Sequence, residues 1–99
     1  MTALSSIALS GMNAAQTRMA VAGHNIANVQ TPGFRAQQVA QRTQAAGGVA
    51  TAVTQSPQPG VSLANEIVGQ MNAGYAFKAN LRTLEVERNT LGTLLDLQA

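Results

Sequence analysis

Ninety-nine residues are enough for one small domain, and their composition limits what that domain can do. The absence of cysteine excludes disulfides, thiolate metal sites and cysteine nucleophiles, and three aromatic residues leave little bulk for a core. The net charge of +2 is too small to argue for nucleic acid, and no apolar run approaches the roughly 20 residues that span a membrane.

Small and apolar residues recur along residues 3–28 in steps of three and four, which predicts a helix that packs on another helix. These positions are Ala8, Met12, Ala15, Met19, Ala22, Ile26 and Val29. Gly11 and Gly23 each disfavour a helix interior by about 1 kcal/mol relative to alanine, which suggests that another backbone approaches closely there. The lone histidine, His24, has no acidic neighbour in sequence, and we expect it to form a hydrogen bond near the helix end rather than bind a metal.

The segment after this helix has the composition of a turn. Pro32 presets φ for the second position of a type II β-turn over residues 31–34, and Gly33 supplies the positive φ of the third. Pro32 also disfavours helical backbone at Thr31. Asn28 can end the helix or bond its own downstream backbone.

Residues 36–60 contain little that a folded domain would bury. Glutamine, alanine, threonine and glycine dominate, and residues 56–60 read Ser-Pro-Gln-Pro-Gly, which interrupts any helix. This composition predicts an extended or mobile linker. A short hairpin around Gly47-Gly48 is the alternative, because residues 49–54 tolerate a strand.

A second helix is predicted over residues 61–97. Positions 63, 67, 70, 74, 77, 81, 84, 88, 91 and 95 follow steps of four and three throughout, and most are apolar. Gln70, Gly74 and Arg88 weaken the row, whereas Leu91 to Leu97 form its most hydrophobic part. Gly69, Gly74 and Gly92 again suggest close packing.

These elements together predict an all-α fold. The N- and C-terminal helices would pair as an antiparallel coiled-coil hairpin, with an extended or partly disordered central linker. Residues 1–35 (helix and turn) and 61–99 (heptad helix) would form one discontinuous helical domain, and 36–60 the low-complexity linker. Residues 1–60 carry arginines and no acid, whereas the four acids lie in residues 61–99. The positive first part of one copy could therefore attract the slightly negative second part of another, head to tail. Simple solvation of these scattered charges is the alternative interpretation.

Two segments resemble the bacterial flagellar rod and hook family of axial proteins, in the proximal-rod type and in a short form. The first is an assembly motif that matches at Asn25, Ile26, Ala27, Asn28, Thr31, Pro32, Gly33, Phe34 and Arg35. The second is the C-terminal helix, with matches at 66–68, 76–80 and 91–97. Members commonly have Tyr where this chain has Phe77. The two segments cover about two-thirds of the chain.

The resemblance implies a structural subunit of the flagellar basal-body axial rod. Paired terminal helices would assemble with copies of the chain and with other rod proteins into a helical tube that transmits torque. The residues expected to join the helices are Ala15, Met19, Ala22, Ile26, Phe77, Leu81, Leu84, Leu91 and Leu95. The family further implies export through the flagellar type III apparatus without a cleaved signal peptide, and a location in the periplasmic rod.

Other functions remain as alternatives at this point. A soluble coiled-coil adaptor or secretion chaperone would form a stable small oligomer. An interfacial amphipathic helix should have a polar face rich in Lys and Arg, which is not the pattern here. An enzyme is not expected, because the chain has one histidine, no phosphate loop and no clustered carboxylates beyond Glu85 and Glu87. We expect no cofactor, metal, nucleic acid, small-molecule substrate or membrane insertion.

Overall fold

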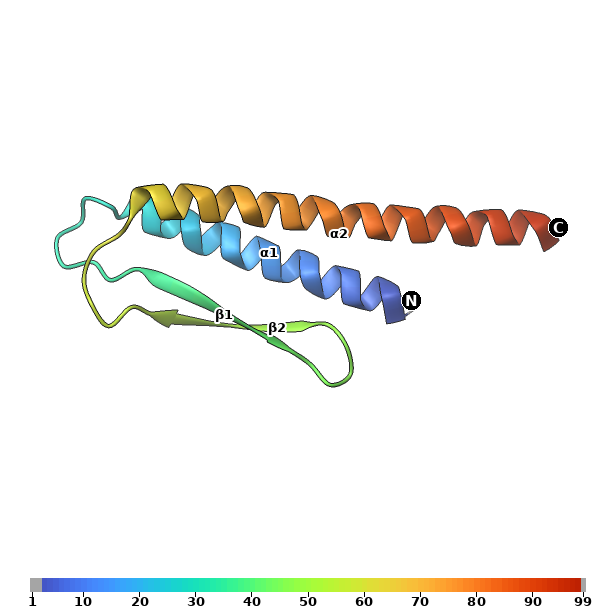
Figure 1. Cartoon of the computed structure of the whole chain (residues 1–99), viewed down its shortest axis with the longest axis horizontal. Helices are drawn as coiled ribbons and strands as arrows, with labels where there is room; N and C mark the ends of the chain where they lie inside the picture. Colours follow the sequence, from blue (N-terminus) through green and yellow to red (C-terminus); the bar gives the residue numbers. More distant parts are fainter. Residues whose placement is uncertain (1–2, 99) are drawn as a thin grey trace.

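The structure, a computed structural model, describes residues 3–98 as two long helices connected by a β-hairpin (Figure 1). Helix α1 spans Ala3–Ala27, strand β1 Gln37–Thr43, strand β2 Val49–Gln55 and helix α2 Leu63–Gln98. The described elements extend over 64 × 25 × 13 Å, and the radius of gyration is 17.4 Å. A compact domain of about 100 residues has a radius of gyration of about 13 Å. The chain is therefore elongated and thin.

The predicted all-α fold is wrong, because β1 and β2, which lie between the two helices in sequence, form a two-stranded antiparallel sheet. The register pairs Gln37 with Gln55 and Thr43 with Val49. Gly47 and Gly48 have φ values of +95° and +90°, so both residues adopt the left-handed backbone that closes the hairpin. Valine and threonine in the strands suit a pleated surface. Low hydrophobicity suggested a linker, but the hairpin packs on α1 and gains partners that the sequence pattern did not reveal.

The two helices lie side by side and run in opposite directions (Figure 1). Near the start of α1, the Ser5 hydroxyl donates a hydrogen bond of 2.6 Å to the Glu87 carboxylate. Further along, a Cβ on Gly11 would come within 2.6 Å of the Asn80 side chain. Ser62 caps α2, because its carbonyl accepts from the Glu66 amide at 3.0 Å and its hydroxyl from the Asn65 amide at 3.4 Å.

The described core consists of small side chains. The buried apolar residues are all alanines, and they are Ala8, Ala14, Ala15, Ala22 and Ala73. The largest fully buried side chain is Asn25. Because hydrophobic stabilisation grows with the apolar area removed from water, alanines contribute little of it. The fold of a single copy therefore rests on close backbone packing and on a few hydrogen bonds.

Candidate assembly interface

The end of α1 is joined to the hairpin by one buried side chain. Asn25 is 0% exposed, and its Nδ2 donates to the Gln37 carbonyl at 2.9 Å. Its Oδ1 accepts from the Gln37 amide at 2.8 Å. The Asn25 carboxamide thus bonds to both the N–H and the C=O of Gln37, as the backbone of a paired strand would do. This pair positions the hairpin against α1.

Asn28 continues the junction beyond the helix end. Its Nδ2 donates to the His24 carbonyl at 2.9 Å, which satisfies one of the last helical carbonyls. The Thr31 hydroxyl donates to Asn28 Oδ1 at 3.2 Å, and the Thr31 amide donates to the Asn28 carbonyl at 3.0 Å. Asn28 therefore links the last turn of α1 to the following turn.

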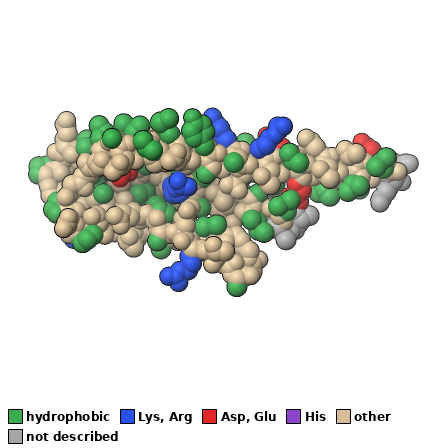
Figure 2. All heavy atoms as spheres, in the orientation of Figure 1, with side chains coloured by type: hydrophobic (Ala, Val, Ile, Leu, Met, Phe, Trp, Pro, Cys, Tyr) green, Lys and Arg blue, Asp and Glu red, His purple; other side chains and the backbone are tan. Residues whose placement is uncertain are grey.

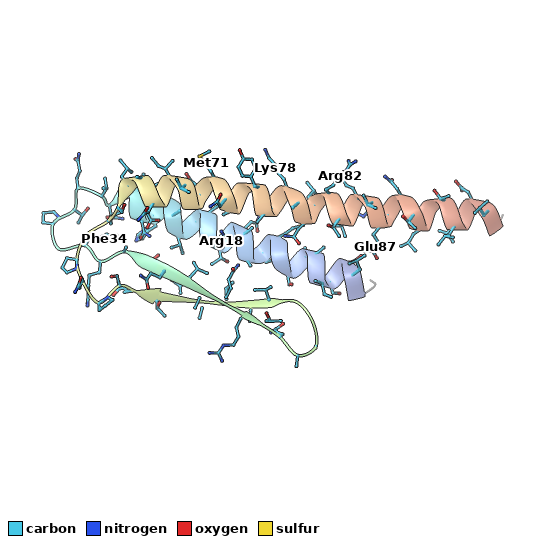
Figure 3. All side chains as sticks on the ribbon, in the orientation of Figure 1. Arg18, Phe34, Met71, Lys78, Arg82 and Glu87 are labelled. Atoms are coloured by element: carbon cyan, nitrogen blue, oxygen red, sulfur yellow. The ribbon has the colours of Figure 1, made fainter. Side chains whose placement is uncertain are left out.

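Residues 31–34 form the turn expected from their sequence. Gly33 has a φ of +71°, and the Phe34 amide donates to the Thr31 carbonyl at 3.3 Å. The Phe34 ring lies edge-on to the His24 ring, with a centroid separation of 5.5 Å and an interplanar angle of 64°. Figure 3 shows Phe34 beside the start of the hairpin. In this structure the His24 ring thus contacts Phe34 at the helix end.

The turn after α1 also contacts the segment of residues 56–60 that leads to α2. The Gly60 amide donates to the Phe34 carbonyl at 2.9 Å, and Arg35 and Gly60 form an isolated parallel bridge. The Ser56 amide donates to the Ala36 carbonyl at 2.7 Å. The predicted assembly motif is therefore the place where α1, the base of the hairpin and the entry to α2 meet.

Most of the motif is accessible from outside. Asn25 is buried, and Ile26, Asn28 and Phe34 are half-buried. The remaining members are exposed, and these are Ala27, Thr31, Pro32, Gly33 and Arg35. The buried and half-buried members hold the junction together, whereas the exposed members form a loop surface at one end of the molecule (Figure 1).

The predicted helix-joining residues divide into two groups in the structure. Ala15 and Ala22 are buried, and the half-buried members are Met19, Ile26, Phe77 and Leu84. Leu81 is 37% exposed, Leu91 44% and Leu95 67%. The structure thus brings the first group to the helix pair and leaves the last leucines open.

The face of α2 that meets α1 combines Phe77 and Leu84 with smaller residues. The least exposed residues of α2 follow helical spacing along one side of the helix, and they are Glu66, Gly69, Ala73, Gly74, Ala76, Phe77, Asn80, Leu84 and Glu87. Several of these residues are small, as are Ala8, Ala15 and Ala22 of α1, so the two helices can approach closely. Sequence reasoning followed the larger apolar residues, so it included Phe77 and Leu84 but missed Ala73, Ala76 and Asn80. The detectable signal of this face was the occurrence of glycine and alanine at helical spacing.

Large apolar side chains remain on the outer edge of α2. Ile67 is 44% exposed, Val68 55%, Met71 56% and Tyr75 63%. Figure 2 shows hydrophobic side chains gathered along this edge, and Figure 3 places Met71, Lys78 and Arg82 on it. A single copy therefore leaves apolar surface of the kind that marks a protein–protein contact.

Two adjoining grooves lie along the second half of α2. One of about 370 Å³ is lined by Leu4, Arg82, Thr83, Val86, Glu87, Thr90 and Leu91. The other, of about 320 Å³, is lined by Val86, Asn89, Thr90, Thr93 and Leu94. Each threonine hydroxyl in these grooves donates to the carbonyl four residues earlier in the same helix. The hydrogen-bonding capacity of the hydroxyl donors is thus used within the helix, which makes the grooves more apolar than their composition suggests.

Comparison with known families identifies the N-terminal third of the chain. Residues 6–35 match the family described as flagella basal body rod protein. The match confirms the resemblance to the basal-body rod family over these residues. The match begins at Ser6 and ends at Arg35, the last residue of the assembly motif, so it covers most of α1 and the turn. Among curated proteins, none matches the chain.

The family supports a flagellar basal-body rod component, which is a structural class of protein and not an enzyme class. Within residues 3–98, no group of three or more His, Asp or Glu residues is placed to hold a metal ion. In the same part of the chain, neither helix is both long and apolar enough to cross a membrane.

Proposed function

We propose that this chain is a structural subunit of the flagellar axial rod. Copies of the chain, together with other rod proteins, would assemble through the paired terminal helices into a helical tube that transmits torque. We further propose that the chain reaches the periplasmic rod through the flagellar type III export apparatus without a cleaved signal peptide. Residues 1–35 and 61–99 would act as one helical unit in the tube.

One observation carries this proposal: small side chains are buried while large apolar ones are exposed. Buried apolar residues are alanines, whereas sixteen large apolar residues of the described chain are more than one-third exposed. Exposed apolar surface is stabilised when another molecule covers it. A single copy with this distribution gains more from contacts with neighbours than from its own core.

The expected contacts are heterologous, with one surface meeting a different surface of the next copy. The two ends of the molecule differ, since one carries the loop of residues 28–35 and the other the last turns of α2 (Figure 1). A heterologous contact that does not close into a ring generates a helical assembly. This geometry supports a tube rather than a symmetric dimer.

A concentration series tests the proposal. The purified chain is followed by circular dichroism and sedimentation velocity, and concentrated samples are viewed by electron microscopy. We expect helicity and particle mass to rise together, ending in filaments or tubes. Replacement of Ile67 and Met71 with serine should weaken assembly, whereas replacement of the exposed Gln70 with serine should not. A defined small oligomer at all concentrations would instead favour the adaptor or chaperone alternative.

A further inference from the structure

The last two turns of α2 extend past the start of α1. The Ser5–Glu87 hydrogen bond places the described start of α1 opposite about residue 89 of α2. Leu4 of α1 still shares a groove with Thr90 and Leu91, and the seven residues from 92 to 98 continue for about 10 Å beyond it. The leucines of this last part of α2 are open, with exposed fractions of 44% for Leu91, 51% for Leu94 and 67% for Leu95. We call Leu91, Leu94 and Leu95 the leucine overhang.

The leucine overhang continues the side of α2 that contacts α1. Eighteen residues make five full turns of a helix at 3.6 residues per turn, so residues eighteen apart share one side. Leu91 lies eighteen residues after the buried Ala73. By the same count, Leu94 follows Ala76, and Leu95 follows Phe77. The intramolecular helix contact thus runs on into a leucine surface in which Leu91 borders the groove beside Leu4 and in which Leu94 and Leu95 are more than half exposed.

The opposite end of the molecule carries a projecting loop. Residues 28–35 reach beyond the start of α2 in Figure 1, at the end far from the leucine overhang. Val29 is 38% exposed, and Pro32 and Gly33 are exposed at the turn. The turn is held by the Phe34–Thr31 and Thr31–Asn28 backbone hydrogen bonds. At one end of the molecule α2 extends beyond α1 and exposes the leucine overhang. At the other end the loop of residues 28–35 projects and exposes apolar side chains.

The charges of the two ends favour contact between unlike ends. Within residues 28–36 the single charged residue is Arg35, which is exposed. Within residues 90–98 the single charged residue is Asp96, which carries a negative charge. Two like ends would bring charges of the same sign together, whereas unlike ends attract. This difference argues against a symmetric pairing of two leucine overhangs.

We propose that the loop of residues 28–35 of a second copy docks on the leucine overhang, with Val29 and Pro32 against Leu91, Leu94 and Leu95. This inference rests on the proposed function, because it names the contact by which copies join end to end. The contact is heterologous and repeats from copy to copy, so it gives the assembly a direction.

Cysteine cross-linking tests the contact, and the natural chain contains no cysteine that would interfere. Val29→Cys and Leu94→Cys are prepared separately, mixed in equal amounts and oxidised under conditions in which the wild-type chain assembles. We expect at least a tenfold excess of the mixed 29–94 dimer over either homodimer. The double variant V29C/L94C should give a ladder of multimers. The matched control is Val53→Cys mixed with L94C, because Val53 is 50% exposed on the hairpin and lies outside both surfaces.

The outcomes separate this contact from the proposed function. Efficient dimerisation of L94C alone would indicate pairing of like ends and overturn the inference, as would equal cross-linking of the Val53 control. Filaments without any 29–94 cross-link would also overturn it while leaving the proposed function intact. If the wild-type chain does not assemble at all, both the docking contact and the proposed function are wrong. Circular dichroism checks that each variant keeps its helicity, and Leu95→Cys replaces L94C if that variant does not.

Discussion

Asn25 and Gln37 form a closed pair in which the side chain of one residue bonds to both backbone groups of the other, at 2.9 and 2.8 Å. The two residues stand on either side of the turn, at the end of α1 and the start of β1. A second link joins the far end of the hairpin, where the Val49 amide donates to the Ser10 hydroxyl at 3.1 Å. The hairpin is thus attached to α1 at its base, through Asn25, and next to its tip, through Ser10.

Asn25→Ala should release the start of β1. Two hydrogen bonds are lost and the Gln37 polar groups near a buried site lose their partners, which should destabilise the fold by about 2–3 kcal/mol. Hydrogen exchange of the Gln37 amide is expected to accelerate at least tenfold, while the Val49 amide, held by Ser10, changes little. Asn28→Ala is the matched control with a smaller effect. Unchanged protection of Gln37 would show that the pair does not hold the hairpin.

Gly11→Ala and Gly74→Ala should have effects of opposite sign. A Cβ at Gly11 would meet the Asn80 carboxamide at 2.6 Å, and Asn80 is itself held by a 2.8 Å hydrogen bond to the Ala76 carbonyl. A Cβ at Gly74 meets no described atom within 4 Å, so alanine there should stabilise the helix by about 1 kcal/mol. Urea unfolding followed by circular dichroism measures both changes. A stabilising G11A variant would contradict the close approach of the helices.

Ala22→Leu should overpack the helix contact. Ala22 is 5% exposed, and extra methylene groups in a packed site destabilise by about 1–3 kcal/mol. Ala20→Leu is the control, since Ala20 is exposed two residues away on the same helix. The readouts are the midpoint of urea unfolding and the concentration at which assembly begins. Equal behaviour of the two variants would mean that Ala22 does not face α2.

The double substitution of Pro32 and Gly33 with alanine should impair assembly while leaving helicity similar or higher. Gly33 has a φ of +71°, and an alanine in the left-handed region is disfavoured by about 1 kcal/mol or more. Gly33→Asn is the control, because asparagine tolerates this conformation better. Light scattering and electron microscopy follow assembly. If the double variant polymerises at the wild-type rate, the turn is not part of the assembly contact.

Local sequence features were enough to predict the helices and the turn. Heptad spacing predicted helices over residues 3–28 and 61–97, and the structure has them at Ala3–Ala27 and Leu63–Gln98. Pro32 and Gly33 predicted the turn, because each restricts its own φ whatever the surroundings. The motif of residues 25–35 also identified the family from sequence, and the match over residues 6–35 agrees.

The tertiary structure decided the hairpin and the contacting face of α2. Residues 36–60 read as a linker because their strands bury little, and their order comes from Asn25 and Ser10, which are distant in sequence. The predicted row of α2 is half-buried at Phe77 and Leu84 but exposed at Leu91 and Leu95. The small or polar residues Ala73 and Asn80, which were not predicted, also lie on the face that meets α1. Short-range preferences act over a few residues, whereas the choice between two faces of one helix depends on the shape of its partner. The alanine row of α1 allows the two helices to approach closely where α2 also has a small side chain, as at Ala73.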